Sequence, residues 1–296
     1  MRALTSAHKA RPGEGYNAPG RQIVPEGPRS VNADFLAFGY NARMPSRDRT
    51  SRIEAVVLRH SDWGEADRIL WLYTRQMGKV RAIAKGARKI RSRKAGHLEP
   101  FTRVILLLAH GRDLPIVTQA ETMEAYVPLR ENLIRLGYTA YVVEILDRFT
   151  YEEDENQPLY RLLIDTLARL NSGIEPTMVV RYYELRLLEL LGYRPQLFAC
   201  VKCEKEIQPV DQYFSLTQGG VLCPRCGLDS PEASQISVSL LKYLRHFQRS
   251  TFAEAAQVRL TPDLNRQMES LLQRYITHLL ERGLNTPAFI RSVQRE

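Results

Sequence analysis

The sequence predicts an α+β protein of more than one domain, in which an N-terminal β barrel precedes an all-α domain with a four-cysteine insert. Three observations support this prediction. Five short β-rich runs follow one another between residues 51 and 130, amphipathic helical patterns take over after Pro128, and all four cysteines fall into two closely spaced pairs. A chain of 296 residues, 44% of them hydrophobic, can bury the cores of two domains.

Residues 1 to 50 come first and show neither a helical nor a strand period. They hold eight Lys and Arg against four acids, with five Gly and five Pro. Such a composition cannot bury a core, so we expect a flexible basic tail. Met44 lies shortly before the first expected strand and is an alternative start site, which would make residues 1 to 43 an extension.

The barrel is expected in residues 51 to 130. Its five strands, separated by charged or Gly-containing turns, are predicted at Ile53–His60, Ala66–Thr74, Lys79–Lys85, Phe101–Ala109 and Pro115–Tyr126. Five strands of this length favour a small closed barrel, with the OB type as the leading candidate. Ile69, Trp71 and Tyr73 share one face of the second strand, while Leu70 and Leu72 share the other. Two apolar faces indicate a buried strand.

The helical domain is expected in residues 131 to 296. Apolar residues recur there at steps of three and four, which is the period of an amphipathic helix. The clearest patterns span residues 134 to 149, 159 to 170, 176 to 192 and 261 to 283. For the last of these, Thr261 is the expected N-cap and Pro262 the first helical residue.

The four cysteines form two C-x2-C pairs separated by nineteen residues, and they use every cysteine in the chain. Two such turns present four thiolates to one Zn²⁺, which predicts a closed, structural zinc site within an insert at residues 198 to 228. The alternative is a set of redox thiols or a site that has lost its metal. The metal ligands of the first interpretation are Cys200, Cys203, Cys223 and Cys226. Apolar runs between the pairs predict a hairpin, and metal binding is expected to stabilise an insert with little core of its own.

Positive charge is concentrated in the barrel. The whole chain carries a net charge of +9, but residues 51 to 130 carry +7 and residues 131 to 296 carry −2. A run without any acid, from Arg75 to Lys94, begins on a barrel strand and continues into a loop that contains Gly and Ser, where flexible cations can follow a phosphate backbone. The predicted DNA-binding residues in this run are Arg75, Lys79, Arg81, Lys85, Arg88, Lys89, Arg91, Arg93 and Lys94.

Aromatic residues near this run allow two interpretations. Trp63, Trp71 and Tyr73 can offer stacking surfaces to bases, but their pattern favours barrel core. The acidic run Glu152–Glu155 follows a helix and precedes Pro158, which favours a solvated loop over a divalent-metal site.

No catalytic residues are predicted. The six histidines are scattered outside any metal-ligand spacing, and the sequence contains neither a Walker-type nor a Rossmann glycine loop. The longest apolar run, Val104 to Ala109, is far shorter than the roughly 18 to 20 residues of a membrane-spanning helix. Without an apolar signal region at the N-terminus, the expected location is the cytoplasm.

The barrel motifs resemble the RecO family of bacterial DNA repair proteins. The resemblance rests on the combination of Ala55–Arg59, Gly64–Arg68, Tyr73–Thr74, Gly78–Lys79 with Lys85–Lys89, and Leu98–Phe101. It extends over about residues 51 to 285, through Gly192 and Tyr193 to the four-cysteine knuckle, and excludes the first 50 residues. It implies an OB fold, a helical domain with a zinc insert, and no catalytic turnover.

The same resemblance implies a recombination mediator. Such a protein binds single- and double-stranded DNA and anneals complementary strands. With RecR it helps to load RecA onto strands coated by single-strand-binding protein, whose acidic C-terminal tail is a further expected partner. An association with the nucleoid would follow.

Composition alone leaves two other functions open. One is a zinc-ribbon RNA-binding protein of translation or ribosome assembly, and the other, less favoured, is a metal-dependent nuclease. Competition between single-stranded DNA and structured RNA separates the first from a DNA-binding protein, and a cleavage assay with Mg²⁺ exposes the second.

Overall fold

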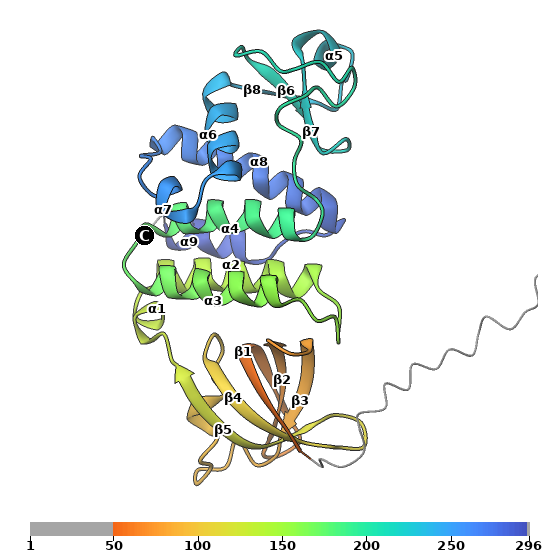
Figure 1. Cartoon of the computed structure of the whole chain (residues 1–296). Coiled ribbons are helices and arrows are strands. Elements are labelled where there is room, and N and C mark those ends of the chain that lie inside the picture. Colours follow the sequence, from red (N-terminus) through yellow and green to blue (C-terminus); the bar gives the residue numbers. More distant parts are fainter. Residues whose placement is uncertain (1–49, 295–296) are drawn as a thin grey trace, which may run out of the picture. The chain divides into compact units, whose positions relative to one another are not determined.

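A computed structural model describes residues 50 to 294 of the chain, which belong to one compact unit. The expected basic tail and the start at Met44 lie outside the described residues. Five strands come first, followed by helices and a second, three-stranded sheet (Figure 1). The predicted α+β class is confirmed. No helix in the part of the chain that the structure describes is long and apolar enough to cross a membrane.

The first five strands close into an OB-type barrel, as predicted. They are β1 (Thr50–Trp63), β2 (Asp67–Thr74), β3 (Gly78–Ala84), β4 (Arg103–Ala109) and β5 (Ile116–Glu124). Their order around the barrel is β1-β2-β3-β5-β4, and β1 pairs with both β2 and β4. A short parallel contact between Ile83 of β3 and Ile116 of β5 completes the closure. The short helix η1 (Ala95–His97) lies in the β3–β4 connection.

The two faces of each barrel strand pack into different cores. Leu70 and Leu72 of β2 point into the barrel interior, where they meet residues such as Val104 and Leu106. Tyr73, on the opposite face of β2, belongs instead to the cluster formed by the helices. The prediction that both faces of β2 are apolar and covered is confirmed for these residues, because one face fills the barrel and the other packs against helices.

The helical region begins directly after the barrel. Its helices are α1 (Val127–Glu131), α2 (Leu133–Phe149), α3 (Gln157–Asn171), α4 (Pro176–Leu190), α6 (Val238–Arg249), α7 (Phe252–Ala255), α8 (Pro262–Leu280) and α9 (Thr286–Val293). The predicted start of α8 is confirmed, since the Thr261 side chain accepts a hydrogen bond from Leu264 N at 3.3 Å. The sequence patterns did not predict α6 or α9.

The core of the helical region contains a buried ion pair. Arg181 and Glu184 lie on one face of α4, are both fully buried, and approach to 3.0 Å. The Tyr141 hydroxyl of α2 donates to the Glu184 carboxylate, and Glu269 of α8 lies 3.9 Å from the Arg181 guanidinium. These four side chains therefore connect α2, α4 and α8.

The insert between α4 and α6 holds the second sheet. Its strands β6 (Gln212–Ser215), β7 (Gly220–Leu222) and β8 (Ser234–Ile236) are antiparallel in the order β7-β6-β8, beside the short helix α5 (Pro224–Leu228). β6 and β7 form the hairpin expected between the cysteine pairs. Phe214, Val221 and Leu222 join the same hydrophobic cluster as the helices, so the apolar residues of the insert pack into a core that it shares with the helical region.

Polar contacts join the barrel to the helices. The Lys79 ammonium lies 3.1 Å from the Asp147 carboxylate and donates to the Asp147 carbonyl oxygen at 2.6 Å. Glu54 of β1 accepts hydrogen bonds from Arg103 and, at 3.0 Å, from the Tyr160 hydroxyl of α3. Burial raises the pKa of Glu54, but the bonds from Arg103 and Tyr160 outweigh it and leave that pKa below its ordinary value.

Candidate metal centre and nucleic-acid interface

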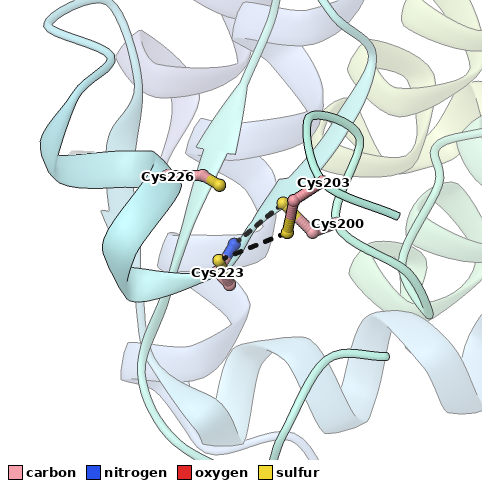
Figure 2. A group of neighbouring side chains, drawn as sticks. All are labelled: Cys200, Cys203, Cys223 and Cys226. Atoms are coloured by element: carbon pink, nitrogen blue, oxygen red, sulfur yellow. Dashed lines mark hydrogen bonds between the residues drawn. The ribbon is translucent and has the colours of Figure 1, made fainter. Parts of the chain in front are cut away.

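Four cysteine side chains converge between the two knuckles of the insert (Figure 2). All four sulfur atoms lie within 4.8 Å of one another, and the sulfurs of Cys203 and Cys223 are 3.9 Å apart. A tetrahedral Zn²⁺ with bonds of about 2.3 Å separates its sulfur ligands by roughly 3.8 Å. The donor set and its spacing therefore fit a metal ion of this kind.

Local backbone structure explains this convergence. Cys200 and Cys203 lie in a tight turn, in which Glu204 N donates to the Cys200 carbonyl at 2.8 Å. Cys223 caps the N-terminus of α5, so that Cys226 follows one turn later on the same side. Gly227 is required beside it, because a Cβ there would come within 2.2 Å of the Tyr213 ring.

The protein environment favours thiolate at one of these positions. Burial raises the pKa of Cys200, but backbone N–H groups, led by that of Cys223 at 3.4 Å, lower it to about 6. Hydrogen bonding with Cys223 raises the pKa of Cys226 to about 12, because the clustered sulfurs share protons. A cation among the sulfurs would replace these protons.

The cluster has the properties of a structural metal site. Cys200 and Cys226 are buried, and four sulfurs complete a tetrahedron without leaving a position for substrate. The cysteines are the one group of this kind found in the described part of the chain. The acidic run at residues 152 to 155 is not part of such a group, and Glu152 instead pairs with Arg81 at 2.6 Å.

The nine predicted DNA-binding cations divide into two sets. Those of the first set, Arg75, Lys79 and Arg81, precede or lie on β3 and have acidic partners. Lys79 and Arg81 pair with Asp147 and Glu152 of the helical region, while Arg75 lies 3.7 Å from Glu54. The structure thus gives the two β3 cations a role in joining the barrel to the helices.

The second set lies in the β3–β4 connection, which we call the basic loop (residues 85 to 94). Its exposed cations are Lys85, Arg88, Lys89, Arg91 and Arg93. Lys94 is different, because it donates to the Val117 carbonyl at 2.8 Å and burial lowers its pKa. Ile90 is fully exposed between two of these cations. The loop therefore presents a row of positive charge to solvent.

The base of this loop is fixed to the β1–β2 turn (residues 62 to 67). Gly86, with φ of +67°, donates its N–H to the Asp67 carboxylate at 2.7 Å. Arg88 donates its backbone N–H to the Ala66 carbonyl at 2.9 Å, and its guanidinium lies 3.2 Å from the Asp62 carboxylate. These bonds fix the start of the loop to the β1–β2 turn.

The three aromatic residues near the run have three different environments. Trp63 is 58% exposed, so the prediction of barrel core is wrong for it. Tyr73 is buried, but in the helical cluster and not in the barrel interior. Trp71 is half-buried, packs against the same cluster, and carries the Arg59 guanidinium 3.5 Å above its ring.

Sequence reasoning missed the residues that support the interface. The Asp62 carboxylate pairs with Arg88, and the Asp67 carboxylate accepts a hydrogen bond from Gly86 N. Both acids lie outside the basic run in sequence, so the run itself gave no sign of them. A polar pocket of 440 Å³ was also missed, lined by residues of both the barrel and the helices, including Arg59, Trp71 and Asp147. A signal existed only for the turn, where Asp62 and Asp67 bracket a glycine.

Together, a closed OB-type barrel with an exposed cationic loop and a helical region with four clustered cysteines that could hold a metal ion define a class of OB-fold proteins with a cysteine-rich insert. Two family models match the chain: "Recombination protein O N terminal" over residues 49–126 and "Recombination protein O C terminal" over residues 130–288. The chain belongs to the RecO family of DNA repair proteins.

Curated relatives agree with this assignment. DNA repair protein RecO of Roseiflexus sp. (strain RS-1) is 41% identical over 249 residues, which cover 84% of this chain and 88% of the relative. DNA repair protein RecO of Pelotomaculum thermopropionicum is 37% identical over 240 residues, with 81% and 93% covered. That of Dehalococcoides mccartyi (strain CBDB1) is 31% identical over 231 residues, with 78% and 91% covered.

Proposed function

We propose that this protein is a DNA-binding recombination mediator that acts without catalytic turnover. It binds and anneals single-stranded DNA and, with RecR, helps to load RecA onto strands coated by single-strand-binding protein. Its place of action is the nucleoid in the cytoplasm. The observation that carries the proposal is the basic loop, five of whose cations are exposed on an OB-type barrel.

Electrostatics supports DNA as the ligand of this loop. Each phosphate that a lysine or arginine neutralises releases condensed counterions, so a row of exposed cations gives affinity without base specificity. A mediator that must act on any sequence needs this kind of contact. Because Lys79 and Arg81 are paired with acids of the helical region, we assign direct phosphate contacts chiefly to Lys85, Lys89 and Arg91 with their loop neighbours.

We also propose that the four cysteines hold one structural Zn²⁺. The distances between their sulfur atoms, all within 4.8 Å, match a tetrahedral site. The insert that carries them connects α4 to α6. When bound, the ion would fix the two knuckles relative to each other and thereby stabilise the helical region. The role of the metal would be in folding and not in DNA contact.

Protein partners would meet the helical half, whose net charge of −2 disfavours DNA. For the acidic and aromatic tail of single-strand-binding protein we propose cations on α4 and α6. The Arg186 guanidinium forms an ion pair with the Glu189 carboxylate at 2.6 Å. Arg249 stacks on the Phe198 ring at 3.7 Å, beside Arg245. Burial and the positive charge of Arg249 both lower the pKa of Arg245. An anionic peptide would relieve this repulsion.

The test removes the loop charge and compares it with an equal loss of charge elsewhere. The loop variant replaces with Ala the residues Lys85, Arg88, Lys89 and Arg93. The control variant replaces with Ala four exposed cations of the helical region, namely Lys242, Arg259, Arg266 and Arg274. Binding of single-stranded DNA is measured over a range of salt concentrations, with thermal unfolding as the check on folding.

The loop variant should bind more weakly, and the slope of log affinity against log salt should flatten by up to about 3, since each single-strand phosphate contact contributes about 0.7. The control variant should keep most of the slope. Equal slopes in the folded loop variant and the parent would refute the site. A preference of the parent for structured RNA over single-stranded DNA would refute the function.

A further inference from the structure

An indole ring is exposed at one end of the barrel. Trp63 ends β1 and is 58% exposed, which is unusual for a side chain that gains so much from burial. The chain has one other tryptophan, Trp71, and that ring is half-buried and covered by the Arg59 guanidinium at 3.5 Å. Trp63 is therefore the tryptophan that is open to a planar ligand.

The basic loop is bonded to both chain neighbours of this tryptophan. The Arg88 guanidinium lies 3.2 Å from the Asp62 carboxylate and donates to the Gly64 carbonyl oxygen, also at 3.2 Å. Arg88 thus links the side chain of Asp62 and the backbone of Gly64, the two chain neighbours of Trp63, to the start of the loop. An exposed aromatic face and a row of exposed cations are consequently parts of one surface.

This combination matches the chemistry of an unpaired nucleic-acid strand. Cations bind its phosphates, while its bases, which a duplex keeps stacked inside, can lie on an aromatic ring. We propose that Trp63 is a base-stacking residue of the loop interface and that it gives the protein a preference for single-stranded over duplex DNA. The inference rests on the proposed function and names the residue that recognises the unpaired state.

The charges around Trp63 fix which side of the strand meets the ring. Asp62 is neutralised by Arg88 and lies 3.7 Å from Arg68, but Glu65 is exposed in the same turn. A carboxylate there repels phosphates, whereas the cations of the loop attract them. The phosphates therefore follow the loop, and the bases turn toward Trp63.

One experiment separates stacking from charge. Trp63→Ala, Trp63→Phe and Trp63→Leu are each titrated with oligothymidine, with an abasic oligonucleotide of the same length, and with a duplex. Trp63→Ala should weaken binding of oligothymidine about 5- to 100-fold and leave the abasic strand and the duplex almost unchanged. Trp63→Phe should restore most of the loss, and Trp63→Leu, which is apolar but has no ring system, should not.

Tryptophan fluorescence gives a direct readout. In a Trp71→Phe variant, Trp63 is the remaining tryptophan, and oligothymidine should quench its emission while the abasic strand should not. A Trp63→Phe variant, which keeps Trp71, should show little quenching with either strand.

Equal losses on oligothymidine and the abasic strand, or unquenched Trp63 at saturating oligothymidine, would overturn the assignment of stacking to Trp63. This failure differs from failure of the proposed function. If the four-cation loop variant loses affinity for both strands while Trp63→Ala loses none, the loop site stands and the stacking residue is refuted.

Discussion

The helical region and the basic loop use charged residues in opposite ways. In the helical region Arg181 and Glu184 are fully buried against each other, and their remaining partners come from two further helices. In the loop, cations such as Lys89 and Arg93 are exposed. A buried charge must be paired, since an unpaired one costs several kcal/mol, whereas an exposed cation contributes little to folding. Substitutions in the two regions should therefore separate stability from DNA affinity.

The largest effect that tests this separation is removal of the metal. Elemental analysis should find one zinc per chain, and Cys203→Ser or a strong chelator should sharply lower the midpoint of denaturant unfolding, because binding of a structural metal is coupled to folding. DNA affinity should be retained wherever the protein stays folded. Metal-free protein of full stability, or a disulfide under reducing conditions, would contradict the metal assignment.

The buried ion pair should give the next largest effect. At pH 8, above the raised pKa of Glu184, Glu184→Gln keeps an acceptor for the Tyr141 hydroxyl but leaves Arg181 without its nearest counter-charge, so it should destabilise the protein by about 3–5 kcal/mol. The double variant Arg181→Met, Glu184→Leu should regain much of that loss. Urea unfolding of the three proteins measures both changes. A double variant as unstable as the single one would show that the charges themselves are needed.

The same residue predicts a pH dependence. Burial raises the pKa of Glu184 to about 7, although the Arg181 charge and the Tyr141 hydrogen bond oppose this rise. Between its ordinary pKa of 4.5 and 7, the folded protein therefore holds a proton that the unfolded chain releases, and stability falls as the pH rises through this window. The difference in unfolding free energy between parent and Glu184→Gln should shrink from pH 5 to pH 8. A difference that grows would contradict the raised pKa.

A smaller effect should distinguish the strand cations from the loop cations. The double variant Lys79→Ala, Arg81→Ala removes pairs with Asp147 and Glu152 and should lower stability by about 1–2 kcal/mol, with little change in the salt slope of DNA binding. Lys89→Ala with Arg91→Ala should do the reverse, flattening the slope by about 1 to 1.5 and leaving stability unchanged. Matching slopes for the two variants would mean that the strand cations also contact DNA.

The smallest effect is expected at the N-terminus. A chain that starts at Met44 loses a net positive charge from residues 1 to 43 and should lose only some DNA affinity at low salt, because such attraction is screened at physiological ionic strength. Its unfolding midpoint and metal content should not change. Loss of strand annealing at physiological salt would instead show that these residues have a specific role.

The sequence predicted those parts of the molecule in which local pattern and structure agree. The five barrel strands, the start of α8 at Thr261 and the four clustered cysteines all follow from periodicity, capping or spacing. It did not predict where long side chains would find partners. Lys79 and Arg93 are both cations of the same basic run, and the sequence does not distinguish them. Only the tertiary structure shows that Asp147 lies beside Lys79.

The exposure of Trp63 was missed for a related reason. A tryptophan at the end of a β-rich run is normally buried, and the pattern gave no sign that β1 extends beyond the barrel core to residue 63. α6 differs, because its local sequence does carry a helical signal: Leu240, Leu241, Leu244 and Phe247 form a buried stripe at helical spacing, and Ser237 caps the N-terminus. The environment decided the outcome for Trp63, whereas for α6 a pattern present in the sequence was overlooked.

The outer face of the barrel bears on how such a protein can evolve. The side chains of Val56, Leu58 and Tyr73 do not belong to the barrel interior and pack instead into the core of the helical region. A gene segment that encoded only the strands would produce a protein with an uncovered apolar surface, prone to self-association. The barrel therefore cannot be exchanged as a free-standing module, and any recombination event that transfers it must also transfer α2 and α3 or supply a substitute for them.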